Sequence, residues 1–219
     1  MAKAPFIVDK DLKHLLKVAS ISGELPVRNV ALLYCIYGTG MMLTEVARLP
    51  LSTYLKADGS ILDKSCVPAD VAYNGKQRPL WWSNTKVTTA IDAYLAHRVA
   101  NKHGVTTRKA AYRSLDPDSP LFFSVDGKPY KLTKRTTATG TISYTCDSLS
   151  QLFKNLHLQA GIEGASAMSG RRTFAVRLHR HGFDLRHINE LLGHETLTAT
   201  KRLIDADPVR LGELVAGVI

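Results

Sequence analysis

Cysteine is scarce in this chain, and the few cysteines lie far apart. Cys35, Cys66 and Cys146 are odd in number and do not share a short spacing. They therefore provide neither a disulfide framework nor the paired spacing of a zinc site. We expect no metal, no cofactor and a reducing compartment such as a bacterial cytoplasm.

Long hydrophobic runs are also missing. No stretch approaches the roughly 20 apolar residues that a membrane-spanning helix needs. Residues 1–5 (MAKAP) are not followed by an apolar run of signal-peptide length, and no internal repeat is evident. With 219 residues, 45% of them hydrophobic, the chain is expected to form one domain over 1–219 with a buried core.

Acidic residues are outnumbered by basic ones. The chain has 29 Lys and Arg against 19 Asp and Glu, a net charge of +10. Such an excess favours a polyanionic partner such as nucleic acid, or less specifically a membrane surface. Residues 101–113 and 128–135 are basic and weakly patterned. A solvated surface explains either segment alone, but the two together favour a DNA groove.

Most of the chain has the apolar spacing of packed helices. Helices are expected in residues 9–20, 26–38, 43–49, 85–99 and 149–160. Short antiparallel strands are expected in 51–55, 66–73 and 77–82, with an Asn-Gly hairpin turn at Asn74, and in 121–125. Residues 127–148 are rich in Thr, Lys and Gly and are expected to be a loop. The predicted fold class is α+β, mainly helical, with a small antiparallel sheet.

Residues 169–203 predict a compact unit of three helices. Gly182 ends the first helix and Asp184 can cap the second. Gly193 ends the second, and Thr196 or Thr198 can cap the third. Between the apolar positions lie the cations of this unit: Arg171, Arg172, Arg177, Arg180, Arg186, His187 and His194. Metal binding by its histidines is disfavoured because no cysteine or carboxylate completes a ligand set.

The same unit carries two ordered motifs. One is Arg-Arg-Thr-Phe-Ala from Arg171, and the other is Gly-x-Asp-Leu-x-x-Ile-x-x-Leu-Leu-Gly-His from Gly182 to His194. Together they resemble the C-terminal motif region of tyrosine recombinases, the family of phage integrases. Residues 37–49 (YGTGMMLTEVARL) resemble the family's N-terminal arginine box. The resemblance extends from about Pro5 to the end of the chain and implies the catalytic-domain fold of that family.

The resemblance also implies an organisation. The family's separate N-terminal DNA-clamping domain is expected to be absent, because the matching region begins almost at Met1. The apolar segment 207–219 is expected to be a helix. It would dock on another protomer or a recombinase partner, as tail helices of relatives do, or fold back onto its own core.

The resemblance further implies a phosphodiester chemistry. In the family a tyrosine attacks a DNA phosphate and becomes joined to the DNA. Two arginines and a histidine stabilise the developing charge, and a hairpin lysine protonates the leaving hydroxyl. By this resemblance Arg171 and His194 are retained phosphate ligands. Lys76 lies in the hairpin turn and could be the family's lysine. By local register, however, the position of that catalytic lysine corresponds to Tyr73.

Three other family positions carry apolar residues. Met42 stands in place of the first arginine, Met168 in place of a histidine, and Leu203 in place of the nucleophilic tyrosine. An aliphatic side chain cannot act as a nucleophile. The resemblance therefore implies a degenerate active site, partly filled by adaptable methionines. Arg171 as an ordinary surface arginine and His194 as a packing residue at a helix end remain alternatives.

Three functions follow as hypotheses. The first is a DNA-binding accessory factor or regulator of recombination or transcription, without catalysis, associated with the bacterial nucleoid or a mobile element. The second is an active site-specific recombinase with an unusual nucleophile at Thr198 or Thr200, and the third is a protein-interaction scaffold. For the first, double-stranded DNA is the partner and no membrane is involved. The expected DNA contacts are Arg98, Lys102, Arg108, Lys109, Arg113, Lys131, Lys134, Arg135, Arg171, Arg172, Arg177 and Arg186.

Overall fold

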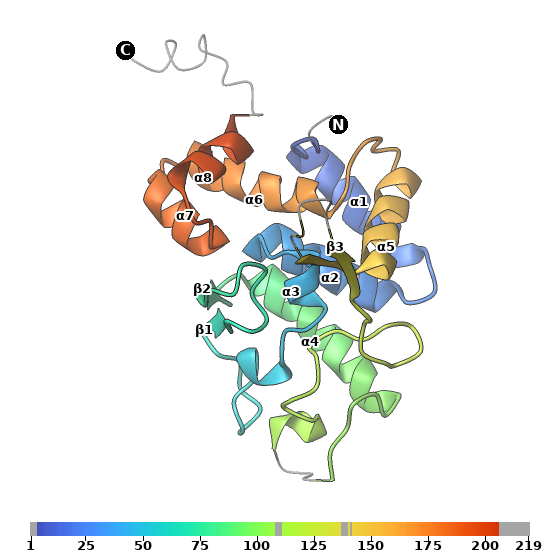
Figure 1. The fold of residues 1–219 in the computed structure, drawn as a ribbon. Coiled ribbons are helices and arrows are strands. Elements are labelled where there is room, and N and C mark those ends of the chain that lie inside the picture. Colours follow the sequence, from blue (N-terminus) through green and yellow to red (C-terminus); the bar gives the residue numbers. More distant parts are fainter. Residues whose placement is uncertain (1–3, 108–110, 137–139, 141, 206–219) are drawn as a thin grey trace.

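The computed structural model describes residues 4–107, 111–136, 140 and 142–205, and it is mainly helical (Figure 1). Its helices are α1 (Asp9–Ile21), α2 (Pro26–Thr39), α3 (Leu43–Val46), α4 (Thr85–Ala100), α5 (Asp147–Gln159), α6 (Ala167–Arg180), α7 (Leu185–Leu192) and α8 (Leu197–Ile204). Its strands are β1 (Lys64–Val67), β2 (Arg78–Trp81), β3 (Thr133–Thr136) and β4 (Ile142–Thr145). The α+β, mainly helical fold class is confirmed. Within these residues, no helix is both long and apolar enough to cross a membrane.

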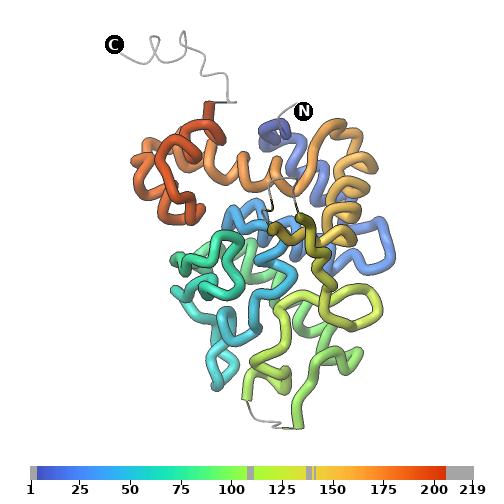
Figure 2. The backbone as a smooth tube through the Cα atoms, viewed as in Figure 1, coloured from blue at the N-terminus to red at the C-terminus, as the bar shows by residue number. Residues whose placement is uncertain are grey.

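Helix α2 forms the centre of the main core. It begins with Pro26 in the first helical turn, where a backbone N–H would have no acceptor within the helix. Most of its side chains are buried. It packs against α1, α4 and α6 (Figure 1). The approach of α6 is close: a Cβ atom on Gly170 would lie 2.7 Å from Ile36 Cγ2. Glycine at this position therefore lets two helices that are distant in sequence pack closely, as the chain path in Figure 2 shows.

A second, smaller apolar cluster holds the C-terminal helices together. It consists of Ala175, Ile188, Leu192, Leu203 and Ile204, from α6, α7 and α8. The predicted ends of these helices are confirmed. The Asp184 side chain accepts from Arg186 N at 2.6 Å, and Thr196 Oγ1 accepts from Ala199 N at 3.2 Å. Gly193 ends α7 with a φ of 66°, in the left-handed region that glycine adopts without strain.

The first strand pair is shorter than predicted. Strands β1 and β2 are antiparallel, with Ser65 opposite Leu80, and residues 68–77 connect them. The predicted strand over 66–73 stops at Val67 because Pro68 starts a turn, in which Val71 N and Ala72 N both donate to the Pro68 carbonyl. The connection is therefore a loop and not a tight Asn-Gly hairpin.

Two predicted strands are absent and one hairpin was missed. Residues 51–55 contain the 3₁₀ turn Leu51–Thr53, and residues 121–125 form no strand. Strands β3 and β4 instead pair antiparallel within the segment predicted to be a loop. Seven of their eight residues are exposed and the eighth is half-buried, so the hairpin lacks the alternation of buried and exposed residues by which a strand is recognised.

Candidate functional site

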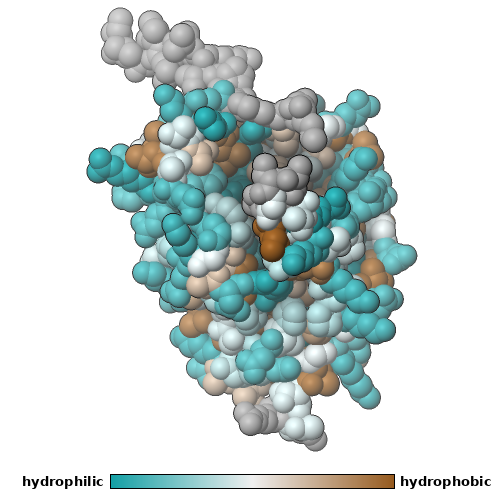
Figure 3. Space-filling view, viewed as in Figure 1, coloured by the Kyte–Doolittle hydropathy of each residue, from teal (hydrophilic) through white to brown (hydrophobic). Residues whose placement is uncertain are grey.

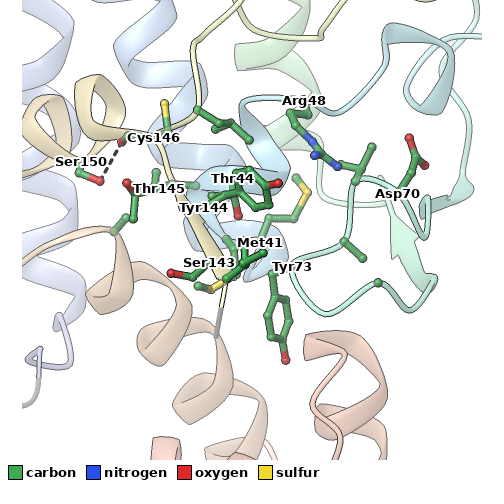
Figure 4. Close-up of a pocket in the computed structure, with 18 of the residues that line it drawn as sticks. Met41, Thr44, Arg48, Asp70, Tyr73, Ser143, Tyr144, Thr145, Cys146 and Ser150 are labelled. Atoms are coloured by element: carbon green, nitrogen blue, oxygen red, sulfur yellow. Dashed lines mark hydrogen bonds between the residues drawn. The ribbon is translucent and has the colours of Figure 1, made fainter. Parts of the chain in front are cut away.

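Five of the residues singled out by the family resemblance lie in or beside one cleft of the fold. Met42 lies between α2 and α3, Tyr73 in the 68–77 loop, and Met168 in the first turn of α6. These three side chains line one cleft (Figure 4). Arg171 and His194 lie beside it, close enough for the Arg171 charge to act on His194.

Arg171 is buried and joins two parts of the backbone through hydrogen bonds. Its side chain is 2% exposed, its Nη1 donates to the Gly40 carbonyl, and its Nη2 donates to the Leu192 carbonyl at 2.6 Å. These carbonyls lie at the C-terminal ends of α2 and α7, where backbone acceptors lack helical partners. Burial lowers the pKa of the Arg171 guanidinium to about 10, so it remains a cation at neutral pH. Two of its five N–H donors are thus engaged within the protein.

Tyr73 covers the guanidinium of Arg171. The Arg171 Cζ atom lies 5.4 Å from the centre of the Tyr73 ring, a cation–π distance. The Tyr73 hydroxyl donates to the Gly193 carbonyl at 3.0 Å, and Asn74 Nδ2 donates to the same oxygen at 2.9 Å. Lys76, by contrast, is largely exposed and pairs with Glu195 at 3.2 Å. The side chain that faces the site is therefore that of Tyr73.

A buried ion pair that the sequence did not reveal supports this arrangement. Arg78 Nη2 lies 2.5 Å from Glu45 Oε2, and the two side chains are 3% and 0% exposed. Arg78 Nη1 also donates to the Leu191 carbonyl at 2.8 Å. The carbonyls of Leu191, Leu192 and Gly193, three in succession at the end of α7, thus all accept from side chains outside α7.

His194 is neutral at physiological pH. Burial, followed by the positive charges of Arg171 and Arg78, lowers the pKa of its imidazole to about 4. Its Nδ1 lies 2.9 Å from Thr200 Oγ1, and this oxygen accepts from Asn189 Nδ2 at 3.0 Å. Residue spacing alone does not indicate this contact between imidazole and hydroxyl. Thr200 is fully buried, so its hydroxyl does not face solvent.

Leu203 packs inside the small C-terminal cluster. Its side chain is 8% exposed, among the aliphatic residues of α6, α7 and α8. The carbonyl of Leu203 accepts from Arg172 Nε at 3.1 Å, and the Arg172 side chain is only 6% exposed. The position at which the family's nucleophile is expected is thus part of a core.

Three of the predicted DNA contacts do not fit their positions. Arg98 is fully buried, and its guanidinium donates to the carbonyls of His103, Pro120 and Leu121 and to Ser119 Oγ. Arg171 and Arg172 are buried as described. All three bind backbone carbonyls inside the protein, and these positions disfavour their prediction as DNA contacts.

The remaining predicted DNA contacts differ in whether their charged groups form ion pairs within the protein. Arg113, Arg135 and Arg177 pair with Asp92, Asp147 and Asp9. The side chains that are exposed and have no ion-pair partner among the described residues are Lys102, Lys131, Lys134 and Arg186. Arg108, Lys109 and the segment 207–219 fall outside the described residues. Within the described part, no group of three or more His, Cys, Asp or Glu side chains could hold a metal ion.

Sequence comparisons match this chain over nearly its whole length. The model of the family described as "Phage integrase family" matches residues 5–208. Tyrosine recombinase XerC of Bacillus licheniformis is 29% identical over 196 residues, which is 90% of this chain and 55% of that protein. XerC of Lacticaseibacillus casei is 30% identical and covers 90% of this chain and 56% of its own length. The chain thus spans about half the length of the curated relatives it matches.

Solved structures share the fold. The XerA recombinase superposes with a TM-score of 0.69 at 19% identity, over 99% of this chain and 65% of that one. The XerH recombinase bound to its difH substrate gives a TM-score of 0.67 at 20% identity, over 99% and 53%. The catalytic domain of bacteriophage HP1 integrase gives 0.56 at 17% identity, over 99% and 96%.

Proposed function

The chain belongs to the phage integrase family, and on that premise we propose that it is a DNA-binding protein that has lost DNA strand transfer. It acts as an accessory factor or regulator of recombination or transcription. DNA as the partner is supported by the net charge of +10 and by the fold. Solved structures that share this fold include XerH on its difH substrate and the Tn1549 integrase on transposon-end DNA.

The observation that carries the loss of chemistry is the state of the phosphate site. Strand transfer needs a nucleophile and fixed donors aimed at the phosphate oxygens. Leu203 supplies no nucleophile and is packed in an apolar cluster. The terminal nitrogens of Arg171 are bound to the Gly40 and Leu192 carbonyls, beneath the Tyr73 ring. Two of the five N–H donors of this guanidinium are thus used within the protein, and the Tyr73 ring lies over it.

DNA would instead be held by the exposed, unpaired cations. Lys131 and Lys134 belong to the exposed hairpin segment, next to Leu132, which lines the cleft. Figure 3 shows this face, where mostly hydrophilic side chains surround a small hydrophobic spot. Lys102 and Arg186 extend the set. Each Lys that contacts a phosphate contributes about one unit to the slope of log affinity against log salt.

A salt series tests the DNA contacts. We expect Lys131→Ala and Lys134→Ala each to weaken binding to mixed-sequence duplex DNA and to lower the salt slope by about one. Lys56→Ala, which removes an exposed lysine outside the predicted set, is the matched control. Slopes that change equally in all three variants would contradict the hairpin contact, and no binding at low salt would contradict the DNA-binding proposal itself.

A suicide substrate tests the lost chemistry. On a nicked duplex that traps covalent protein–DNA intermediates, we expect no adduct with the parent chain under conditions in which the DNA is bound. We expect none with Leu203→Tyr either, because Met42, Tyr73 and Met168 still occupy the places of the other catalytic groups. An adduct with the parent chain would refute the proposal.

One observation keeps the alternative of an unusual nucleophile testable. The contact of Thr200 Oγ1 with His194 Nδ1 places a hydroxyl next to a neutral base. If an adduct formed with the parent chain, its loss in Thr200→Ala would identify that hydroxyl, and its loss in Tyr73→Phe would identify the phenol. Thr200 is buried and bound to Asn189, which is why we favour the inactive assignment.

A further inference from the structure

The cleft above the degenerate site is large and open enough for a small molecule. Its volume is about 670 Å³, within the roughly 300 to 1,000 Å³ typical of ligand pockets. It lies between α3, the 68–77 loop, β4 and the start of α6 (Figure 4). We propose that it binds a small aromatic anion, a role that does not depend on DNA binding.

The walls of the cleft suit an aromatic ring. Met41, Met42 and Met168 contribute three flexible thioethers, and sulfur packs favourably against aromatic rings. Tyr73 and Tyr144 add two ring faces, and both side chains are about half exposed and accessible from outside. Figure 4 shows Met41 and Tyr144 close together, with Tyr73 on the side towards α6 and α7. A planar apolar group can thus be covered by methionines and tyrosines.

The charge of the ligand is indicated by Arg48. This side chain lines the same cleft and is half-buried. Among the described residues, no hydrogen bond or ion pair engages its guanidinium, whereas the buried arginines 78, 98 and 171 all have partners. A guanidinium at the wall of an apolar cleft prefers a carboxylate, sulfonate or phosphate, which it can bind through two parallel hydrogen bonds.

Asp70 is the acidic side chain that also lines the cleft. It is exposed, and no ion pair joins it to Arg48. In Figure 4 its carboxylate points away from Met41 and Tyr144. The Arg48 guanidinium lies between these apolar side chains and Asp70, and no ion pair or hydrogen bond joins it to the Asp70 carboxylate. The hydroxyls of Thr44 and Ser143 are available to fix the orientation of a bound ring.

Two matched dyes test the proposal. Anilinonaphthalene sulfonate carries an aromatic body and one anionic group, and phenylnaphthylamine is its uncharged counterpart. We expect the anionic dye to bind the parent chain about tenfold more tightly, as one charge-assisted hydrogen-bonded pair allows. Arg48→Gln should abolish this difference. Lys56→Gln, which removes the same charge from an exposed side chain that does not line the cleft, should leave it unchanged.

Methionine methyl NMR locates the bound dye. Three of the four methionines line this cleft, so labelled methyl groups report on it directly. We expect the signals of Met41, Met42 and Met168 to shift on addition of the anionic dye. Met168→Glu adds a negative charge at a side chain that is 40% exposed, so the fold tolerates it, and it should weaken the anionic dye most. Circular dichroism confirms that each variant is folded.

Three results would overturn the proposal. The first is equal binding of the two dyes to the parent chain. The second is equal loss of the anionic dye in Arg48→Gln and Lys56→Gln. The third is binding that leaves the three methionine signals in place, since the dye would then lie elsewhere. None of these results bears on DNA binding, which is measured separately by the salt series.

Discussion

Replacing Arg171 by methionine separates a structural role from a phosphate-binding role. Methionine keeps most of the aliphatic volume but removes both donors. If the guanidinium serves chiefly to satisfy the Gly40 and Leu192 carbonyls, Arg171→Met should destabilise the fold and leave the salt dependence of DNA binding unchanged.

The magnitude follows from the two carbonyls. Each buried acceptor that loses its partner costs about 1 to 3 kcal/mol, so the variant should lose roughly 2 to 6 kcal/mol of unfolding free energy. Relief of the buried charge offsets part of this loss, because burial already disfavours the charged guanidinium and lowers its pKa. In a domain of this size each kcal/mol shifts the melting temperature by about 2 to 4 °C.

Arg186→Met is the matched control. Arg186 is exposed at the start of α7 and belongs to the proposed DNA-contacting set. We expect this variant to change stability by no more than about 0.5 kcal/mol and to lower the salt slope. The two variants should therefore show opposite patterns in urea denaturation and in DNA binding, each measured at a temperature where both proteins are folded.

A different outcome would refute the structural role of Arg171. If Arg171→Met kept the parent stability but lowered the salt slope by about one, the guanidinium would be contacting DNA. The Gly40 and Leu192 carbonyls would then need other partners. Loss of both stability and slope would indicate that Arg171 exchanges between carbonyls and phosphate.

Three further predictions concern the same region. Glu45→Gln leaves the Arg78 guanidinium buried without a counter-charge and should cost about 3 to 5 kcal/mol in urea denaturation; a loss below about 1 kcal/mol would contradict the buried pair. The pKa of His194 is lowered to about 4 in the folded chain, so its contribution to stability is complete above the unfolded value of 6.5 and is lost as pH falls from there towards 4. His194→Gln should flatten this decline, as measured by urea midpoints across that range, and an unchanged slope would assign the decline to other groups. Gly193→Ala should cost at least about 1 to 2 kcal/mol, because φ is 66° and the new Cβ would collide with Arg78 Cδ; a melting temperature equal to the parent's would show that the turn can relax.

The helices could be predicted because their local patterns agree with their final packing. The apolar spacing of 85–99 and 149–160 corresponds to buried faces of α4 and α5. Asp184 and Thr196 cap α7 and α8 as their residue types indicate. The strands were harder to predict: Pro68 shortens β1, and the β3–β4 hairpin buries neither face, so no periodic pattern marks it.

The site could be predicted in outline but not in its contacts. The family resemblance identified Met42, Met168 and Leu203 as departures, and the structure places the first two in one cleft and the third in an apolar cluster. Cations, however, are normally assigned to surfaces, and sequence spacing does not show when a distant carbonyl accepts from one. This is why Arg98 was assigned to a DNA surface although it binds the 119–121 segment.

The ion pair of Arg78 with Glu45 could not be predicted for the same reason. Glu45 and Arg78 lie on α3 and β2, which meet only in the folded chain. A glutamate between Thr44 and Val46 and an arginine at the start of an apolar strand are weak indications of burial when taken singly. Only their approach to 2.5 Å identifies them as a pair.

The three carbonyls at the end of α7 also have a consequence for local unfolding. The α7–α8 unit buries only a small apolar cluster, so hydrophobic contacts alone hold it weakly. Its attachment to β2, α6 and the 68–77 loop relies on donors from Arg78, Arg171, Tyr73 and Asn74. Opening the unit would break all of these hydrogen bonds at once, while Arg78 would keep Glu45 and Arg171 would keep the Gly40 carbonyl. Amide hydrogens of α7 and α8 should therefore exchange together, as one cooperative segment that opens before the helices around α2.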